Sequence, residues 1–271
     1  MKELMSVTIT QQNGITRIAQ AGLIAKGIVY VLLGILAFMA AFELGGQSEQ
    51  GADRSGVFST LKDLPAGTLL LALVAAGLFC YSIWRGIQVF RPAHSGGTHK
   101  AGKRLRYLSS GLTYLLVAIT AVRLLVYNSK DSGSGNQEMA ATLLSRSHGQ
   151  WLLGTAALIM AGVGVYQLHY GLSEKYRKHV QGLSLSDPVS SMLLRAGKAG
   201  YVSRGVVWLI VAWLLLKAAL HANSAEAGDT SKAFQFIEHS TAGSLLLGVL
   251  GLGLAAYGVF NFIRARYERF Q

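Results

Sequence analysis

The chain has 271 residues, of which 51% are hydrophobic and only 14% are charged, and its net charge at pH 7 is +12. Soluble domains carry about 25% charged residues, so this composition excludes an ordinary water-soluble protein. The 32 glycines and 3 prolines fit helices that pack closely in lipid, and the single Cys80 excludes an intrachain disulfide.

Residues 1–16 are polar and are predicted to form a loose cytoplasmic arm without a cleavable signal. Beyond them, six apolar runs approach or exceed the roughly 20 residues that cross a hydrocarbon core. We therefore expect an all-α polytopic protein with six transmembrane helices. The predicted spans are Ile18–Phe42, Leu69–Phe90, Tyr107–Tyr127, Trp151–Tyr170, Val202–Ala222 and Leu245–Phe262.

The three connections after the odd-numbered spans combine polar turns with spaced apolar residues, such as Phe58 and Phe234. This pattern predicts a short interfacial helix in each connection. Asp53 and Asp229 occupy equivalent positions, and either one is a candidate N-cap for its short helix.

Small residues recur at fixed spacing in the even-numbered spans. Positions five, eight, twelve and fifteen after Gly67, Gly149 and Gly243 share one helix face, because their steps are three, four and three. Eleven of these twelve residues are small: Ala72, Ala75, Ser82, Gly154, Ala157, Ala161, Gly164, Gly248, Gly251, Ala255 and Gly258, with Phe79 as the exception. The odd-numbered spans carry a similar stripe at steps of seven residues, at Gly27, Gly34 and Ala41, at Gly111, Ala118 and Leu125, and at Gly205, Ala212 and Ala219. The two stripes predict close packing of odd and even helices, within a hairpin or between neighbouring hairpins, although glycine-rich membrane helices also scatter small residues.

Charge is distributed unevenly between the two sides. The N-terminus, the even-to-odd connections and the C-terminus carry eighteen basic and four acidic residues, whereas the opposite side carries seven basic and nine acidic ones. The positive-inside rule therefore predicts that the N- and C-termini are cytoplasmic. The basic face is expected to meet anionic lipid headgroups rather than nucleic acid.

One motif appears three times, at Arg17–Gly34, Ala101–Ala118 and Arg195–Ala212. The repetition predicts three parallel two-helix units around a pseudo-threefold axis along the membrane normal. The expected boundaries are 1–16 for the arm and 17–91, 92–180 and 181–271 for the repeats.

The motif reads R-x(4)-G-x(3)-K/R-G-x-x-Y/W in repeats one and three. Its residues are Arg17, Gly22, Lys26, Gly27 and Tyr30 in the first copy and Arg195, Gly200, Arg204, Gly205 and Trp208 in the third. Repeat two keeps Gly111 and Tyr114 but has Ala101, Arg106 and Ser110 at the other positions. The chain resembles a bacterial three-repeat membrane family catalogued as domain of unknown function 1206. The resemblance implies a multi-pass protein of the bacterial inner membrane and no particular activity.

Equivalent positions near the inner ends of the even spans hold Arg85, Gln167 and Asn261. Such polar residues are candidates for a ring that lines a pore or binds a headgroup. The alternative is that each side chain bridges to a neighbouring helix.

The sequence has no P-loop, no G-x-S-x-G and no H-E-x-x-H, and its histidines form no i, i+4 pair. We therefore expect no enzymatic activity, no cofactor and no metal. The favoured hypothesis is a membrane scaffold, or a protein that binds lipid or an unidentified membrane-protein partner. The alternative is a channel or passive transport protein along the pseudo-threefold axis.

Overall fold

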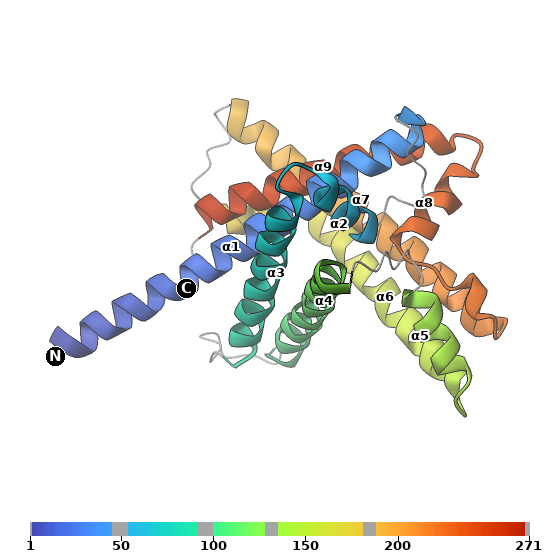
Figure 1. Ribbon diagram of the computed structural model, residues 1–271, viewed down its shortest axis with the longest axis horizontal. Coiled ribbons are helices and arrows are strands. Elements are labelled where there is room, and N and C mark those ends of the chain that lie inside the picture. The colour runs from blue at the N-terminus through green and yellow to red at the C-terminus, as the bar shows by residue number, and fades with distance from the viewer. Residues whose placement is uncertain (1, 45–53, 91–99, 128–134, 181–187, 269–271) are drawn as a thin grey trace.

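A computed structural model describes residues 2–44, 54–90, 100–127, 135–180 and 188–268, and these residues contain no strand (Figure 1). The helices, in chain order, are α1 (Lys2–Ala41), α2 (Arg54–Asp63), α3 (Gly67–Phe90), α4 (Lys100–Tyr127), α5 (Gly135–Leu144), α6 (Gly149–Leu172), η3 (Lys175–His179), α7 (Pro188–Leu220), η4 (Ser224–Glu226), α8 (Thr230–Glu238) and α9 (Gly243–Tyr267).

Five of these helices are long and apolar enough to cross a membrane, so the chain is a membrane-spanning helical protein. The segments are Thr16–Ala41, Gly67–Val89, Gly149–Leu172, Ser190–Leu220 and Gly243–Tyr267. The run predicted at Tyr107–Tyr127 lies in α4, whose apolar part is the shorter segment Ser110–Val126. Basic residues occupy the first two turns of α4 and shorten its apolar part.

The N-terminal residues differ from the expected loose arm, because α1 is already helical at Lys2. Extending an existing helix adds one hydrogen bond per residue and needs no new nucleus, which explains why a polar segment joined to a long span is helical.

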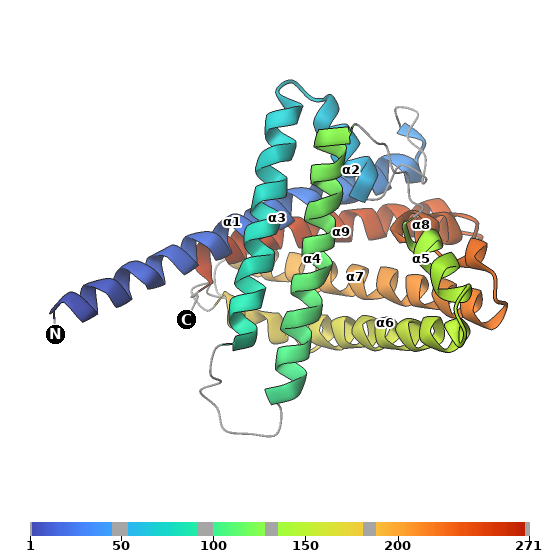
Figure 2. The ribbon, with the colours of Figure 1, turned by 60° about the horizontal axis from the view of Figure 1, so that its bottom comes forward.

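The long helices pack in three antiparallel pairs, namely α1 with α9, α3 with α4 and α6 with α7. Each pair joins the second helix of one repeat to the first helix of another. Figure 2 shows α3 and α4 running across the direction of α1, α9, α7 and α6. Contacts of α1 with α3 and of α7 with α9 hold the pairs together.

Small residues determine where the paired helices meet. A Cβ at Gly34 of α1 would lie 2.4 Å from the backbone nitrogen of Ala255 and from the carbonyl oxygen of Gly251 on α9. On α4, Gly111 faces α3, where its carbonyl oxygen accepts a hydrogen bond from the Ser82 hydroxyl at 2.8 Å. The two predicted stripes therefore pack against each other between neighbouring hairpins, which resolves the alternative left open by the sequence.

A second glycine contact joins the two helices within repeats one and three. A Cβ at Gly22 would lie 2.6 Å from Tyr81 Cβ, and one at Gly200 would lie 2.5 Å from Tyr257 Cβ. Repeat two has arginine instead of glycine at the equivalent position, 106, and only glycine permits so close an approach of two helix backbones. Accordingly, α4 and α6 form no extensive contact with each other in the described part of the chain.

The three short helices predicted in the connections after the odd-numbered spans are present as α2, α5 and α8. On α2 and α8, Phe58 and Phe234 are fully buried, so these helices pack against the ends of the spans. Asp229 is confirmed as an N-cap, since its Oδ1 accepts a hydrogen bond from the Lys232 backbone nitrogen at 3.1 Å. Asp53 lies outside the described residues.

Candidate functional site

The interior of the bundle contains positive charge. Lys26 on α1 and Arg264 on α9 are each only 3% exposed, although both lie within membrane-spanning segments. Arg85 on α3 contacts the Tyr81 ring that Lys26 also contacts, and Arg204 on α7 contacts the Tyr257 ring that Lys26 also contacts. We call these four residues and the tyrosines around them the cationic–aromatic cluster; the tyrosines are Tyr30, Tyr81, Tyr114 and Tyr257.

Lys26 is held by aromatic rings alone among the described residues. Its Nζ lies 5.1, 5.0 and 5.1 Å from the ring centroids of Tyr81, Tyr114 and Tyr257, and no ion pair or hydrogen bond from it is found there. A desolvated cation–π contact contributes up to about 2 kcal/mol. The rings belong to α3, α4 and α9, so a single ammonium contacts helices from all three repeats.

Arg204 takes the place of Lys26 in repeat three. Its guanidinium carbon lies 5.0 Å from the Tyr30 ring and 4.5 Å from the Tyr257 ring, and Nη1 donates a hydrogen bond to the Tyr257 hydroxyl. Gly200 lies one turn before Arg204 and admits the backbone of Tyr257, as Gly22 admits Tyr81 before Lys26. The motif glycine therefore positions the tyrosine that the motif cation contacts.

The other two cations have stronger polar partners. Arg85 donates hydrogen bonds from Nε and Nη2 to the Tyr81 hydroxyl at 2.9 and 2.6 Å. Arg264 forms an ion pair of 2.7 Å with Glu268, and the two side chains are 4% and 10% exposed. Within the described residues, the four cations of the cluster thus have a single carboxylate partner, Glu268.

The three residues of the predicted polar ring form hydrogen bonds to different extents. Arg85 bonds to Tyr81 and to Gln88, whereas Asn261 is fully buried and donates from Nδ2 to the Tyr257 carbonyl oxygen at 2.6 Å. The Oδ1 of Asn261 and the Oε1 of the buried Gln167 have no hydrogen-bond partner in the described structure. The observed bonds lead to residues outside the proposed ring, and the ring itself stays a prediction.

The motif residues have different environments. Arg17 and Arg195 are exposed on the outside of the bundle, and Trp208 is partly buried. Lys26 lies inside, on the opposite face of α1 from Arg17, as the nine-residue spacing predicts. Tyr30 and Tyr114 are buried in the cluster, whereas the glycines at 27, 111 and 205 make helix contacts.

Sequence reasoning did not identify the tyrosines of the even helices as partners of the motif cations. A signal for them was present, since Tyr81 and Tyr257 each lie fourteen residues after the glycine that opens their helix, with Val163 between them in repeat two. An aromatic residue at the same position in repeats one and three coincides with the two repeats that keep the motif cation.

Another tyrosine lies outside the spans, next to the cluster. Tyr176 of η3 packs edge-on against Phe260 and donates a hydrogen bond to the Leu194 carbonyl oxygen at 2.9 Å. Burial raises the pKa of its hydroxyl above the ordinary value, with a smaller contribution from the negative charge of Glu174. The hydroxyl therefore remains a donor at neutral pH.

A curated relative covers almost the whole chain. The uncharacterised protein YxxB of Bacillus subtilis (strain 168) is 28% identical over 256 residues, which span 94% of this chain and 91% of the relative. No solved structure matches the chain.

The family description that matches is Domain of Unknown Function (DUF1206), and it matches three times, at residues 21–91, 105–174 and 199–268. Each segment covers parts of both long helices of one repeat, and together the three segments cover most of the chain. The protein belongs to the DUF1206 family of three-repeat proteins.

Proposed function

We propose that this protein is a non-enzymatic membrane scaffold of the bacterial inner membrane that binds anionic phospholipid headgroups at its cytoplasmic side. The cationic–aromatic cluster is the observation that carries the proposal. Its four cations have one carboxylate among the described residues, and the electric field of buried charge is screened less than that of exposed charge. Lipid phosphates are the anions available at the membrane surface.

We further propose that the chain crosses the membrane six times, with three pseudo-threefold repeats and both termini in the cytoplasm. The length of α4 supports the sixth span, because 28 residues at about 1.5 Å each are longer than a hydrocarbon core of about 30 Å. The pairs α9–α1, α3–α4 and α6–α7 support the symmetry, since each joins the second helix of one repeat to the first helix of another. The positive-inside distribution supports the orientation.

The alternative of a channel has less support. A conducting path needs a polar lumen, whereas Tyr81, Tyr114 and Tyr257 pack around Lys26 and each is at most 5% exposed. The catalytic motifs missing from the sequence favour a binding role over an enzyme.

Lipid selectivity tests the proposal. The purified full chain is transferred to detergent with phosphatidylglycerol or phosphatidylcholine of the same acyl chains, and bound lipid is counted by native mass spectrometry at several salt concentrations. We expect phosphatidylglycerol to be retained preferentially, with a preference that falls as salt rises. Equal retention of both lipids refutes the proposal.

Proteoliposome flux tests the alternative. Ion flux through the wild type should equal that of protein-free vesicles. Flux that disappears in Arg85→Ala, Gln167→Ala or Asn261→Ala would instead establish a pore at the predicted ring.

A further inference from the structure

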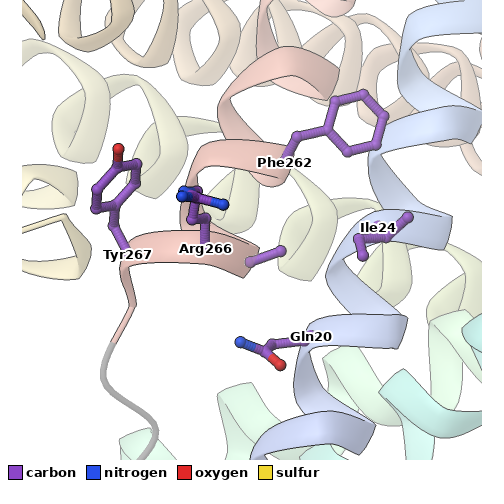
Figure 3. Close-up of a pocket in the computed structure, with 6 residues that line it drawn as sticks. Gln20, Ile24, Phe262, Arg266 and Tyr267 are labelled. Atoms are coloured by element: carbon purple, nitrogen blue, oxygen red, sulfur yellow. The ribbon is translucent and has the colours of Figure 1, made fainter.

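A groove of about 770 Å³ runs along the surface between α1 and α9. Figure 3 shows Gln20 extending from α1 toward the end of α9, and Phe262 extending from α9 toward α1. The lining residues are Gln20, Ile24, Phe262, Ala265, Arg266 and Tyr267.

The groove is polar at one end and apolar at the other. Gln20 lies near the start of its membrane segment, and Arg266 and Tyr267 are the last residues of theirs, so these polar groups lie together at one end of the two antiparallel spans. Ile24 and Phe262 lie one turn further into the spans and are 45% and 36% exposed. This order of polar and apolar groups along the groove matches a phospholipid, whose charged headgroup adjoins an acyl chain.

The polar end of the groove also carries positive charge, which is complementary to an anionic headgroup. Arg266 is exposed and makes no ion pair within the described part of the chain, whereas Arg264, two residues earlier, is neutralised by Glu268. Arg17 is three residues before Gln20, on the same face of α1, and is exposed as well. This end therefore offers guanidinium charge that a phosphate can neutralise.

The equivalent position between α6 and α7 is different. There Lys198 occupies the place of Gln20 and lies 3.6 Å from Glu174, and Leu172 occupies the place of Arg266. The cation at that position already has a carboxylate partner. Among the described residues, charge complementarity thus favours the α1–α9 groove.

We infer that the α1–α9 groove binds one anionic phospholipid. Its phosphate contacts Arg266, with the Gln20 amide and the Tyr267 hydroxyl as further donors, and one acyl chain lies along Ile24 and Phe262. This inference rests on the proposed function, since it assigns a site to the anionic lipid. The first and last helices of the chain form that site together.

Two variants test the two ends of the groove, each with a matched control. Arg266→Gln removes the headgroup charge, and Arg195→Gln removes an exposed charge from α7, outside the groove. Ile24→Trp fills the apolar part, and Leu108→Trp places the same ring at the equivalent exposed position of repeat two. All four replace solvent- or lipid-facing side chains, and an unchanged thermal unfolding midpoint verifies their fold.

Native mass spectrometry of the full chain with phosphatidylglycerol gives the affinity of the most tightly bound lipid molecule. Arg266→Gln should weaken it about fivefold, the effect of one basic residue near an anionic headgroup. Ile24→Trp should weaken phosphatidylglycerol and phosphatidylcholine alike, and both controls should match the wild type.

The outcomes separate the two proposals. A wild type without preference for phosphatidylglycerol overturns the proposed function and the groove together. A wild type that prefers phosphatidylglycerol, with Arg266→Gln and Ile24→Trp equal to their controls, overturns the groove alone and leaves headgroup binding elsewhere on the protein.

Discussion

Replacing Gly34 with alanine tests whether the repeats are joined by close backbone contact. The added methyl group would lie 2.4 Å from two backbone atoms of α9 and 2.8 Å from Ala255 Cβ, where ordinary contacts begin at 3.4 Å. The helices must therefore separate by about 1 Å along the most extensive helix contact among the described residues. Overpacking of this kind costs about 1–3 kcal/mol.

The matched controls are Gly86→Ala and Gly162→Ala, because a Cβ at either position meets nothing within 4 Å. They measure the gain in helix propensity alone, which is up to about 1 kcal/mol. Thermal unfolding in mild detergent, followed by circular dichroism, should rank Gly34→Ala below the wild type and both controls at or above it. A Gly34→Ala variant as stable as Gly86→Ala would refute close packing at the α1–α9 contact.

Three further substitutions test single interactions by the same unfolding assay. Glu268→Gln should destabilise by about 3 kcal/mol, because it leaves the buried Arg264 without its carboxylate, and an unchanged midpoint would contradict the ion pair. Asp229→Ala should cost about 1 kcal/mol through loss of the α8 N-cap, with Asp229→Asn close to the wild type. Tyr176→Phe should cost about 1 kcal/mol by removing the bond to Leu194. Because the folded pKa of Tyr176 is raised, wild-type stability should fall as pH rises above about 10, and Tyr176→Phe should lack that part of the loss.

The positions of five spans along the chain follow from periodicity and composition, which depend on local sequence. The stripes through Gly34 and Gly251 predicted close packing, and the capping pattern at Asp229 predicted the start of α8. Which helices the stripes join was not predictable, because the pattern is the same whether partners come from one hairpin or from two. Only the three-dimensional structure pairs α1 with α9.

The cations of the cationic–aromatic cluster could be identified from the sequence, whereas their aromatic partners could not. Lys26 and Arg204 belong to the recognised motif, and the nine-residue spacing between Arg17 and Lys26 places these two side chains on opposite faces of α1. Their aromatic partners lie more than 50 residues away along the chain, so spacing within one helix carries no information about the contact. Repeat two lacks the close contact between its two helices for a local reason. Arg106 replaces the glycine that admits a tyrosine backbone in repeats one and three.

The contact between the first and last helices joins repeat three to repeat one and forms the lipid groove. Cysteine cross-linking in native membranes tests it most directly, with Ile24→Cys and Phe262→Cys in a Cys80→Ser background and a short bifunctional maleimide. The two residues line one groove, so an intramolecular link that shifts the protein on denaturing gels is expected. Both single-cysteine variants should give none. Failure to link when both cysteines react with a monofunctional maleimide would contradict the contact between α1 and α9.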